Sequence, residues 1–217
     1  MKYKLYLFDF DYTLANSEKG ILKCFRHVLD GLGLTDIPEI AIKRTIGMTL
    51  EDAFIKLTGE HNLEKIRQYR AEFVTKADDV MTKNTEFYPD TLEVLTYIKD
   101  HQSMAGIIST KLAYRIKDQF NKEQALPLLD IIVGGDQVTT PKPAPDGLLY
   151  ALKKLSVDKK DVLYIGDSVI DAKTAQHAGV DFAAVLTGAT TKEEFSEYSC
   201  VTIMNSLSEL LDLSGRC

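Results

Sequence analysis

Two aspartates, Asp9 and Asp11, are the first residues whose type and spacing suggest chemistry; they lie in the run DFDYT at residues 9–13. Residues two apart in an extended chain point to the same side, so both carboxylates can face one site. Adjacent carboxylates repel each other unless a cation or a shared proton relieves the repulsion. The expected partner is a hard cation with oxygen ligands, such as Mg²⁺, although an aspartate at a strand end is often only a capping or turn residue.

Two further carboxylates, Asp167 and Asp171, lie in the run GDSVID at residues 166–171. Asp167 follows a short apolar run and is expected to complete the set of metal ligands begun by the first two aspartates. Asp171 lies one helical turn later, where it can support the site through water or a hydrogen bond. The sequence therefore predicts a Mg²⁺ site that draws on Asp9, Asp11, Asp167 and Asp171.

Residues suited to phosphate follow two other segments. Ser109 and Thr110 come after an apolar run and open a predicted helix, so their hydroxyls and the free backbone N–H groups can hold phosphate oxygens. The same residue types also cap helices for structural reasons alone. Lys142 lies in the run PKPAP, where prolines fix the backbone and can aim one positive charge at phosphate and carboxylate. The alternative for this lysine is an exposed position in a proline-rich turn.

The elements that position these residues alternate along the chain. Short apolar runs of the kind buried on both faces of a parallel sheet are separated by helical stretches. Strands are predicted at residues 3–8, 104–108, 131–133, 162–165 and 180–186, and helices at residues 90–100, 113–121, 145–155 and 170–178. This alternation predicts an α/β fold with a doubly wound, Rossmann-like parallel sheet, in which ligands bind at the carboxyl ends of the strands.

Residues 15–83 interrupt that alternation. Apolar residues Ile21, Phe25, Val28 and Leu29 recur at helical spacing, and further helices are predicted at residues 50–57 and 63–80. The sequence therefore predicts an all-helical cap domain at 15–83, inserted into a core made of residues 1–14 and 84–217.

Composition excludes several classes of protein. The chain has 217 residues, of which 45% are hydrophobic and 27% charged, as expected of a globular protein. A net charge of −6 argues against nucleic acid as a partner. No apolar run is long enough to cross a membrane, and three widely spaced cysteines fit no zinc or disulfide pattern. We expect a cytoplasmic protein that is a monomer or a weak dimer.

Taken together, the motifs resemble one family. In chain order they read D-x-D-x-T, S-T, K-P-x-P and G-D-S-x-x-x-D, with a helical insertion directly after the first. This order is similar to that of the haloacid dehalogenase superfamily, and within it to the phosphoglycolate-phosphatase-like members. The resemblance covers nearly the whole chain.

The resemblance implies roles for each matching residue. Asp9 would be the nucleophile that forms an aspartyl-phosphate, and Asp11 would be the general acid and base. Mg²⁺ would be held by Asp9, Asp167 and the backbone carbonyl of Asp11, with support from Asp171. Lys142, Ser109 and Thr110 would bind the phosphoryl group. Dehalogenase members lack an acid at position 11, so Asp11 favours phosphate chemistry.

Substrate specificity is expected to lie in the inserted cap. Lys43, Arg44 and Gly47 belong to a segment that resembles the loop that caps of this family lower over the substrate. A basic side chain there would suit a carboxylate or second phosphate, and glycine would allow a close backbone approach. The alternative is the solvated basic end of a helix.

The leading prediction is a Mg²⁺-dependent phosphatase acting on a small phosphorylated metabolite, with phosphoglycolate as the first candidate. A sugar-phosphate mutase of the β-phosphoglucomutase type and an inorganic pyrophosphatase remain open alternatives, because the same motifs serve all three. A non-catalytic phosphate-binding or regulatory module is a further alternative, but it needs neither the helical insertion nor Asp11.

Overall fold

The core of the protein is a sheet of six parallel strands, in the order β5-β4-β1-β6-β7-β8. The computed structural model describes residues 2–214. The strands are β1 (Leu5–Phe8), β4 (Met104–Ile108), β5 (Ile131–Val133), β6 (Val162–Gly166), β7 (Asp181–Val185) and β8 (Thr202–Met204). All four residues of β1 are buried, as expected for a central strand covered on both faces.

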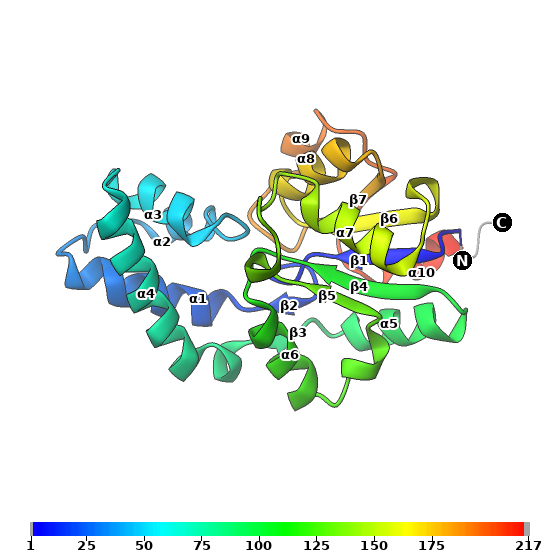
Figure 1. Ribbon diagram of the computed structural model, residues 1–217, viewed down its shortest axis with the longest axis horizontal. Coiled ribbons are helices and arrows are strands. Elements are labelled where there is room, and N and C mark those ends of the chain that lie inside the picture. The colour runs from blue at the N-terminus through cyan, green and yellow to red at the C-terminus, as the bar shows by residue number, and fades with distance from the viewer. Residues whose placement is uncertain (1, 215–217) are drawn as a thin grey trace.

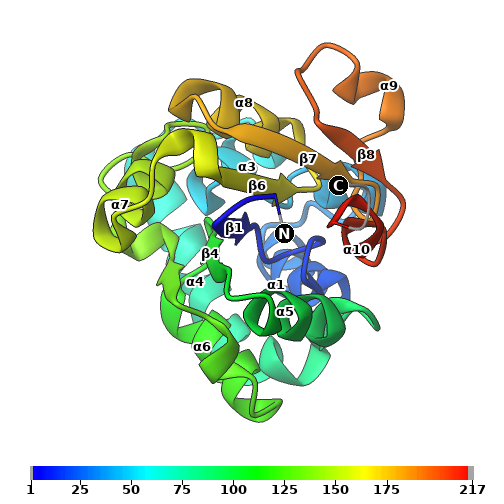
Figure 2. The ribbon, with the colours of Figure 1, turned by 90° about the vertical axis from the view of Figure 1, so that its right-hand side faces the viewer.

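Helices cover both faces of the sheet (Figure 2). On one face α5 (Thr91–Asp100), α6 (Ala113–Lys122) and α10 (Glu209–Ser214) contribute to one apolar cluster. On the other face α7 (Asp146–Leu155), α8 (Val169–Ala178) and α9 (Lys192–Phe195) contribute to a second. The predicted doubly wound α/β core is therefore confirmed.

Strand register places the ends of the central strands at one edge. Phe8 of β1 lies opposite Ile107 of β4 and Ile165 of β6, so the residues that follow these strands emerge side by side. This is the edge at which open parallel sheets bind ligands.

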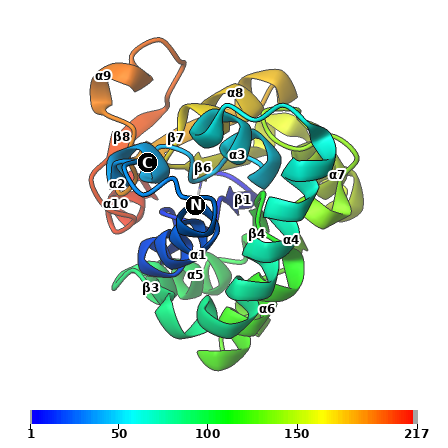
Figure 3. The ribbon, with the colours of Figure 1, turned by 90° about the vertical axis from the view of Figure 1, so that its left-hand side faces the viewer.

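Four helices inserted after β1 form a separate group, which we call the helical insertion: α1 (Glu18–Gly31), α2 (Glu39–Lys43), α3 (Leu50–Thr58) and α4 (Leu63–Val80). It lies beyond the carboxyl ends of the strands (Figures 1 and 3). Phe25, Phe54 and Phe73 form the centre of its own apolar cluster, with ring centroids 4.9–6.2 Å apart. Helix boundaries follow local signals. The Asn62 side chain accepts hydrogen bonds from the first turn of α4, and Gly59, with a left-handed φ of 70°, caps the C-terminus of α3.

Short elements complete the fold. Strands β2 (Ala15–Asn16) and β3 (Glu86–Phe87) pair in antiparallel fashion where the chain enters and leaves the helical insertion. Single 3₁₀ turns occur at η1 (Thr82–Asn84), η2 (Leu126–Leu128), η3 (Gly135–Gln137) and η4 (Lys159–Asp161). The sequence analysis predicted none of these, and it also missed α2, α9, α10 and β8, because elements this short show no usable periodicity.

Two further observations concern the described residues alone. None of their helices is both long and apolar enough to cross a membrane. Cys24 and Cys200 are free thiols, and Cys217 lies outside the described residues.

Candidate active site

Three buried carboxylates meet at the carboxyl edge of the sheet. Asp9 directly follows β1, Asp167 follows β6, and Asp171 lies in the first turn of α8. Each offers a carboxylate oxygen, and these atoms lie within 4.8 Å of one another. The residues are only 1%, 4% and 0% exposed, respectively. The strand register thus brings together three of the predicted metal ligands from distant parts of the chain.

Lys142 lies inside this cluster rather than in solvent. Its Nζ is 3.1 Å from Oδ1 of Asp9 and 2.6 Å from Oδ1 of Asp171. Asp171 also accepts hydrogen bonds from the Tyr164 hydroxyl, at 2.7 Å, and from the hydroxyl and backbone N–H of Ser168. With both carboxylate oxygens already accepting hydrogen bonds, Asp171 is placed to orient the lysine.

Burial and like charge dominate the electrostatics of the cluster. Burial, reinforced by Asp171 and Asp11, raises the pKa of Asp9 to about 7, against the opposing pull of Lys142. The pKa of Asp167 is raised well above its ordinary value by burial and by the charges of Asp171 and Asp9. Burial also opposes the charge on Lys142, but the attraction of Asp171 and Asp9 outweighs it and raises the lysine pKa. One cation therefore faces three carboxylates, an imbalance that suits a divalent metal ion.

Asp167 is held from two directions. The Thr13 hydroxyl donates a 3.0 Å hydrogen bond to its Oδ1, so this threonine supports Asp167. On the other side the backbone of Gly188 packs against the carboxylate, and a Cβ at position 188 would come within 2.0 Å of Oδ2. Glycine is the residue that permits this approach.

The carboxylate of Asp11 lies outside the buried cluster. It accepts hydrogen bonds from the Ser17 hydroxyl and from Lys111 Nζ, the latter at 2.7 Å, and the Lys111 side chain is only 7% exposed. The sequence analysis missed Lys111, although it directly follows Ser109 and Thr110. Asp9 and Asp11 thus face different neighbours despite their close spacing.

The predicted phosphate-binding residues lie around a small hollow. Ser109, Thr110 and Lys142 line a cavity of about 10 Å³ at the end of β4. The Thr110 hydroxyl also donates to the backbone carbonyl of Gly47 at 3.3 Å, so this residue links the core to the helical insertion.

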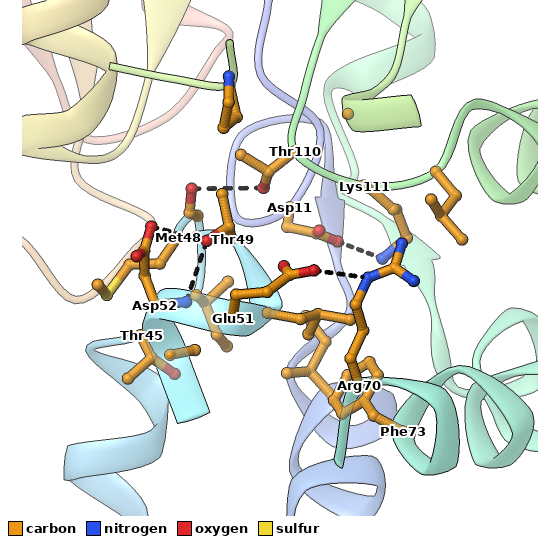
Figure 4. A pocket seen from close by; sticks show the side chains of 18 of the residues that line it. Asp11, Thr45, Met48, Thr49, Glu51, Asp52, Arg70, Phe73, Thr110 and Lys111 are labelled. Atoms are coloured by element: carbon orange, nitrogen blue, oxygen red, sulfur yellow. Dashed lines mark hydrogen bonds and ion pairs between the residues drawn. The ribbon is translucent and has the colours of Figure 1, made fainter. Parts of the chain in front are cut away.

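A larger cavity of about 430 Å³ separates the core from the helical insertion (Figure 4). Asp11, Thr110 and Lys111 line it from the core, and Gly47 and Arg70 line it from the insertion. Since Thr110 borders the small hollow as well, the two spaces are neighbours.

The other two residues predicted for specificity are placed elsewhere. Neither Lys43 nor Arg44 lines the large cavity. Lys43 Nζ lies 2.9 Å from Oε1 of Glu18, and Arg44 is exposed to solvent at the end of α2. Of the predicted cap residues, the structure places Gly47 alone at the cavity.

The doubly wound sheet gathers charged residues at its carboxyl edge, where open α/β sheets bind their ligands. Comparison with known proteins names the family: the model of the haloacid dehalogenase-like hydrolases matches residues 6–185, and the chain belongs to this family.

Individual relatives agree with this placement. A solved structure from Bacteroides fragilis, provisionally assigned as a haloacid dehalogenase-like hydrolase, is 47% identical, with a TM-score of 0.95 over 96% of this chain and 100% of that one. The pyrophosphatase PpaX of Bacillus pumilus is 29% identical over 96% of this chain and 95% of its own. A Lactobacillus plantarum structure, provisionally assigned as a phosphoglycolate phosphatase, shares the fold at 24% identity, with a TM-score of 0.87 over 98% and 100% of the two chains.

Proposed function

We propose that this protein is a Mg²⁺-dependent phosphatase that hydrolyses a small phosphate monoester through an aspartyl-phosphate on Asp9. The observation that carries the proposal is the difference between the surroundings of two aspartates. Asp9 lies in the buried cluster with Lys142, whereas Asp11 lies at the edge of the large cavity. A nucleophile and a proton donor need these two different settings.

Asp9 is the proposed nucleophile. One oxygen of its carboxylate attacks phosphorus, the bond from phosphorus to the ester oxygen breaks, and the phosphoryl group is transferred to Asp9. Lys142 lies 3.1 Å from Asp9 Oδ1, where its charge favours the ionised carboxylate and opposes the negative charge of the phosphoryl group. Ser109 and Thr110 supply further polar groups beside Lys142.

Asp11 is the proposed acid and base. It gives a proton to the departing ester oxygen, and it then takes a proton from the water that hydrolyses the aspartyl-phosphate. Its position at the cavity edge supports this role, because the leaving group would lie in that cavity. Ser17 and Lys111 hold the carboxylate in place.

The chemistry of the buried cluster fits Mg²⁺. Asp9 and Asp167 would hold the ion together with the backbone carbonyl of Asp11, while Asp171 supports the site through Lys142. Bound there, Mg²⁺ would offset negative charge on the transferring phosphoryl group. The raised pKa values of Asp9 and Asp167 support this fit, because burial and the neighbouring carboxylates disfavour their charged forms and a bound cation would offset both effects.

Pyrophosphate hydrolysis is the second candidate, and it is favoured by the similarity to the Bacillus pumilus protein named a pyrophosphatase. The chemistry at Asp9 and Asp11 would be the same, with phosphate in place of an alcohol as the leaving group. The two candidates therefore differ in what occupies the cavity.

Phosphate release tests the proposal. It is measured with Mg²⁺ on a panel of small phosphate esters, pyrophosphate and a hexose 1-phosphate, beside the variants Asp9→Asn and Asp11→Asn. We expect Asp9→Asn to lower kcat by at least about 10³-fold, and a chelator to abolish activity until Mg²⁺ is restored. Asp118→Asn, which changes an exposed aspartate on α6, is the matched control.

Activity that survives both Asp9→Asn and the chelator would contradict the proposal. Isomerisation of the hexose phosphate without net phosphate release would instead indicate a mutase.

A further inference from the structure

The walls of the large cavity are mainly apolar. The helical insertion contributes Phe25, Met48 and Phe73, and the core contributes Leu112 and Val138. A volume of about 430 Å³ lies within the range of about 300–1,000 Å³ that is typical of sites for organic ligands. The space beside Asp11 can therefore hold a leaving group with a substantial apolar body.

The two cations that line the cavity from the core already hold carboxylates. Lys111 Nζ lies 2.7 Å from Oδ1 of Asp11. Arg115 Nη2 lies 2.8 Å from Oδ1 of Asp78 and donates a 2.8 Å hydrogen bond to the Val74 carbonyl. The charge of each side chain is therefore partly offset by a carboxylate.

The third lining cation, Arg70 of α4, is paired as well. Its Nε lies 3.0 Å from Oε1 of Glu51, and Figure 4 shows this pair facing the same cavity as Asp11 and Lys111. Asp52 adds another carboxylate to the lining on the same side. The helical insertion thus presents two carboxylates and one arginine to the cavity.

This arrangement disfavours a leaving group with its own negative charge. Such a group would have to share one of the three cations with the carboxylate that the cation already holds, or else lie beside Glu51 and Asp52, whose negative charges repel it. An uncharged apolar group avoids both costs and gains from its removal from water.

We propose that the cavity selects phosphate monoesters whose leaving group is apolar and uncharged over those that carry a second anionic group, and that the Glu51–Arg70 pair sets this preference. The proposal rests on the proposed phosphatase function. It places specificity on α3 and α4 in addition to Gly47, and no longer on Lys43 and Arg44.

Binding of non-hydrolysable phosphonates tests the preference independently of turnover. We would measure 3-methylbutylphosphonate and 3-phosphonopropionate by titration calorimetry with Mg²⁺ present, because the two have similar shape and differ in a terminal isopropyl or carboxylate group. The expected result is at least about tenfold tighter binding of 3-methylbutylphosphonate. Equal affinities, tighter binding of the carboxylate compound, or no binding of either would overturn the proposal.

The variant Glu51→Gln tests the role of the pair, because it frees Arg70 while its partly exposed position should leave the fold intact. We expect 3-phosphonopropionate to bind about fivefold more tightly than it does to the unchanged protein, and 3-methylbutylphosphonate to change less than twofold. The matched control is Glu64→Gln, at an exposed glutamate of α4 that does not line the cavity. The same gain in affinity for 3-phosphonopropionate in the control, or no such gain in Glu51→Gln, would show that the Glu51–Arg70 pair does not set the preference.

The variant Val74→Phe tests the cavity itself by filling part of it. It should weaken 3-methylbutylphosphonate binding by about tenfold and leave methylphosphonate binding within about twofold. Equal loss for both compounds would contradict an apolar subsite. The two proposals fail in different measurements. The phosphatase proposal fails if no phosphate is released, whereas the preference for apolar leaving groups is judged from phosphonate affinities.

Discussion

Asp9 and Asp11 carry the same functional group two residues apart, yet the fold surrounds them differently. Asp9 is 1% exposed and shares its environment with Asp167, Asp171 and Lys142. Asp11 instead accepts hydrogen bonds at the edge of the cavity. These different environments support the different roles that we propose for two identical side chains, since proteins commonly separate a nucleophile from an acid in this way.

The raised pKa of Asp9 predicts how metal binding depends on pH. A carboxyl whose pKa rises from 3.8 to about 7 on folding destabilises the metal-free fold increasingly as pH rises through that interval. Mg²⁺ must displace the proton, so its stabilising effect should grow over the same interval. Thermal unfolding with and without Mg²⁺ at pH 5, 6, 7 and 8 measures this, and a Mg²⁺ effect that is constant or that shrinks with rising pH would contradict it.

The sequence predicted the residues of the buried cluster better than their partners. Asp9, Asp167 and Lys142 each stand directly beside a recognisable strand or proline-rich run, so their positions follow from local patterns. Lys111 pairs with Asp11 within the core, and Arg70 pairs with Glu51 within the helical insertion, in each case across a long stretch of sequence. No local pattern specifies that kind of contact, because it depends on how distant segments pack.

Burial explains which strands and helices could be predicted from the sequence. β4 and β5 were predicted with the bounds that the structure gives, since their apolar runs reflect burial in the sheet. The edge strand β8 has three residues, of which only Met204 is fully buried, and such a segment carries little pattern. In α2 the five residues likewise include one buried residue, Ile42.

Helices α4 and α6 form a direct contact between the helical insertion and the core. Arg115 of α6 donates to the Val74 carbonyl and pairs with Asp78, while the Tyr114 hydroxyl donates to the same Asp78 carboxylate at 2.6 Å. Asp78 is half exposed, so solvent weakens the Arg115–Asp78 ion pair. The hydrogen bond from Arg115 to the Val74 carbonyl is better shielded from solvent. This contact should favour a closed arrangement of the two parts.

We predict that Arg115→Met loosens that closed arrangement. The radius of gyration from X-ray scattering should increase, and KM for the preferred ester should rise about fivefold or more while kcat changes less. Arg67→Met, at an exposed arginine of α4, is the control and should change neither quantity. An unchanged radius together with an unchanged KM would show that the contact does not hold the two parts together.

The whole molecule has separate apolar clusters in its two parts. The core clusters lie on the two faces of the sheet, whereas the cluster around Phe25, Phe54 and Phe73 lies entirely within the helical insertion and the turn that follows it. The chain passes between the two parts twice, beside the short β2–β3 pairing. This organisation supports the predicted division into a core of residues 1–14 and 84–217 and a cap of residues 15–83, which stays a prediction until the two parts are tested separately.

Phe54→Ala provides that test, because Phe54 is fully buried and contacts both other phenylalanines of its cluster. Truncation of a buried phenylalanine costs about 3–5 kcal/mol. If the cluster is an independent unit, this loss of stability is confined to the helical insertion. Hydrogen exchange should then accelerate at amides of α1, α3 and α4 and remain slow in β1, β4 and β6. Phe120→Ala, in the core, should give the reverse pattern. Equal acceleration throughout the described chain in either variant would mean that the two parts unfold as one cooperative unit.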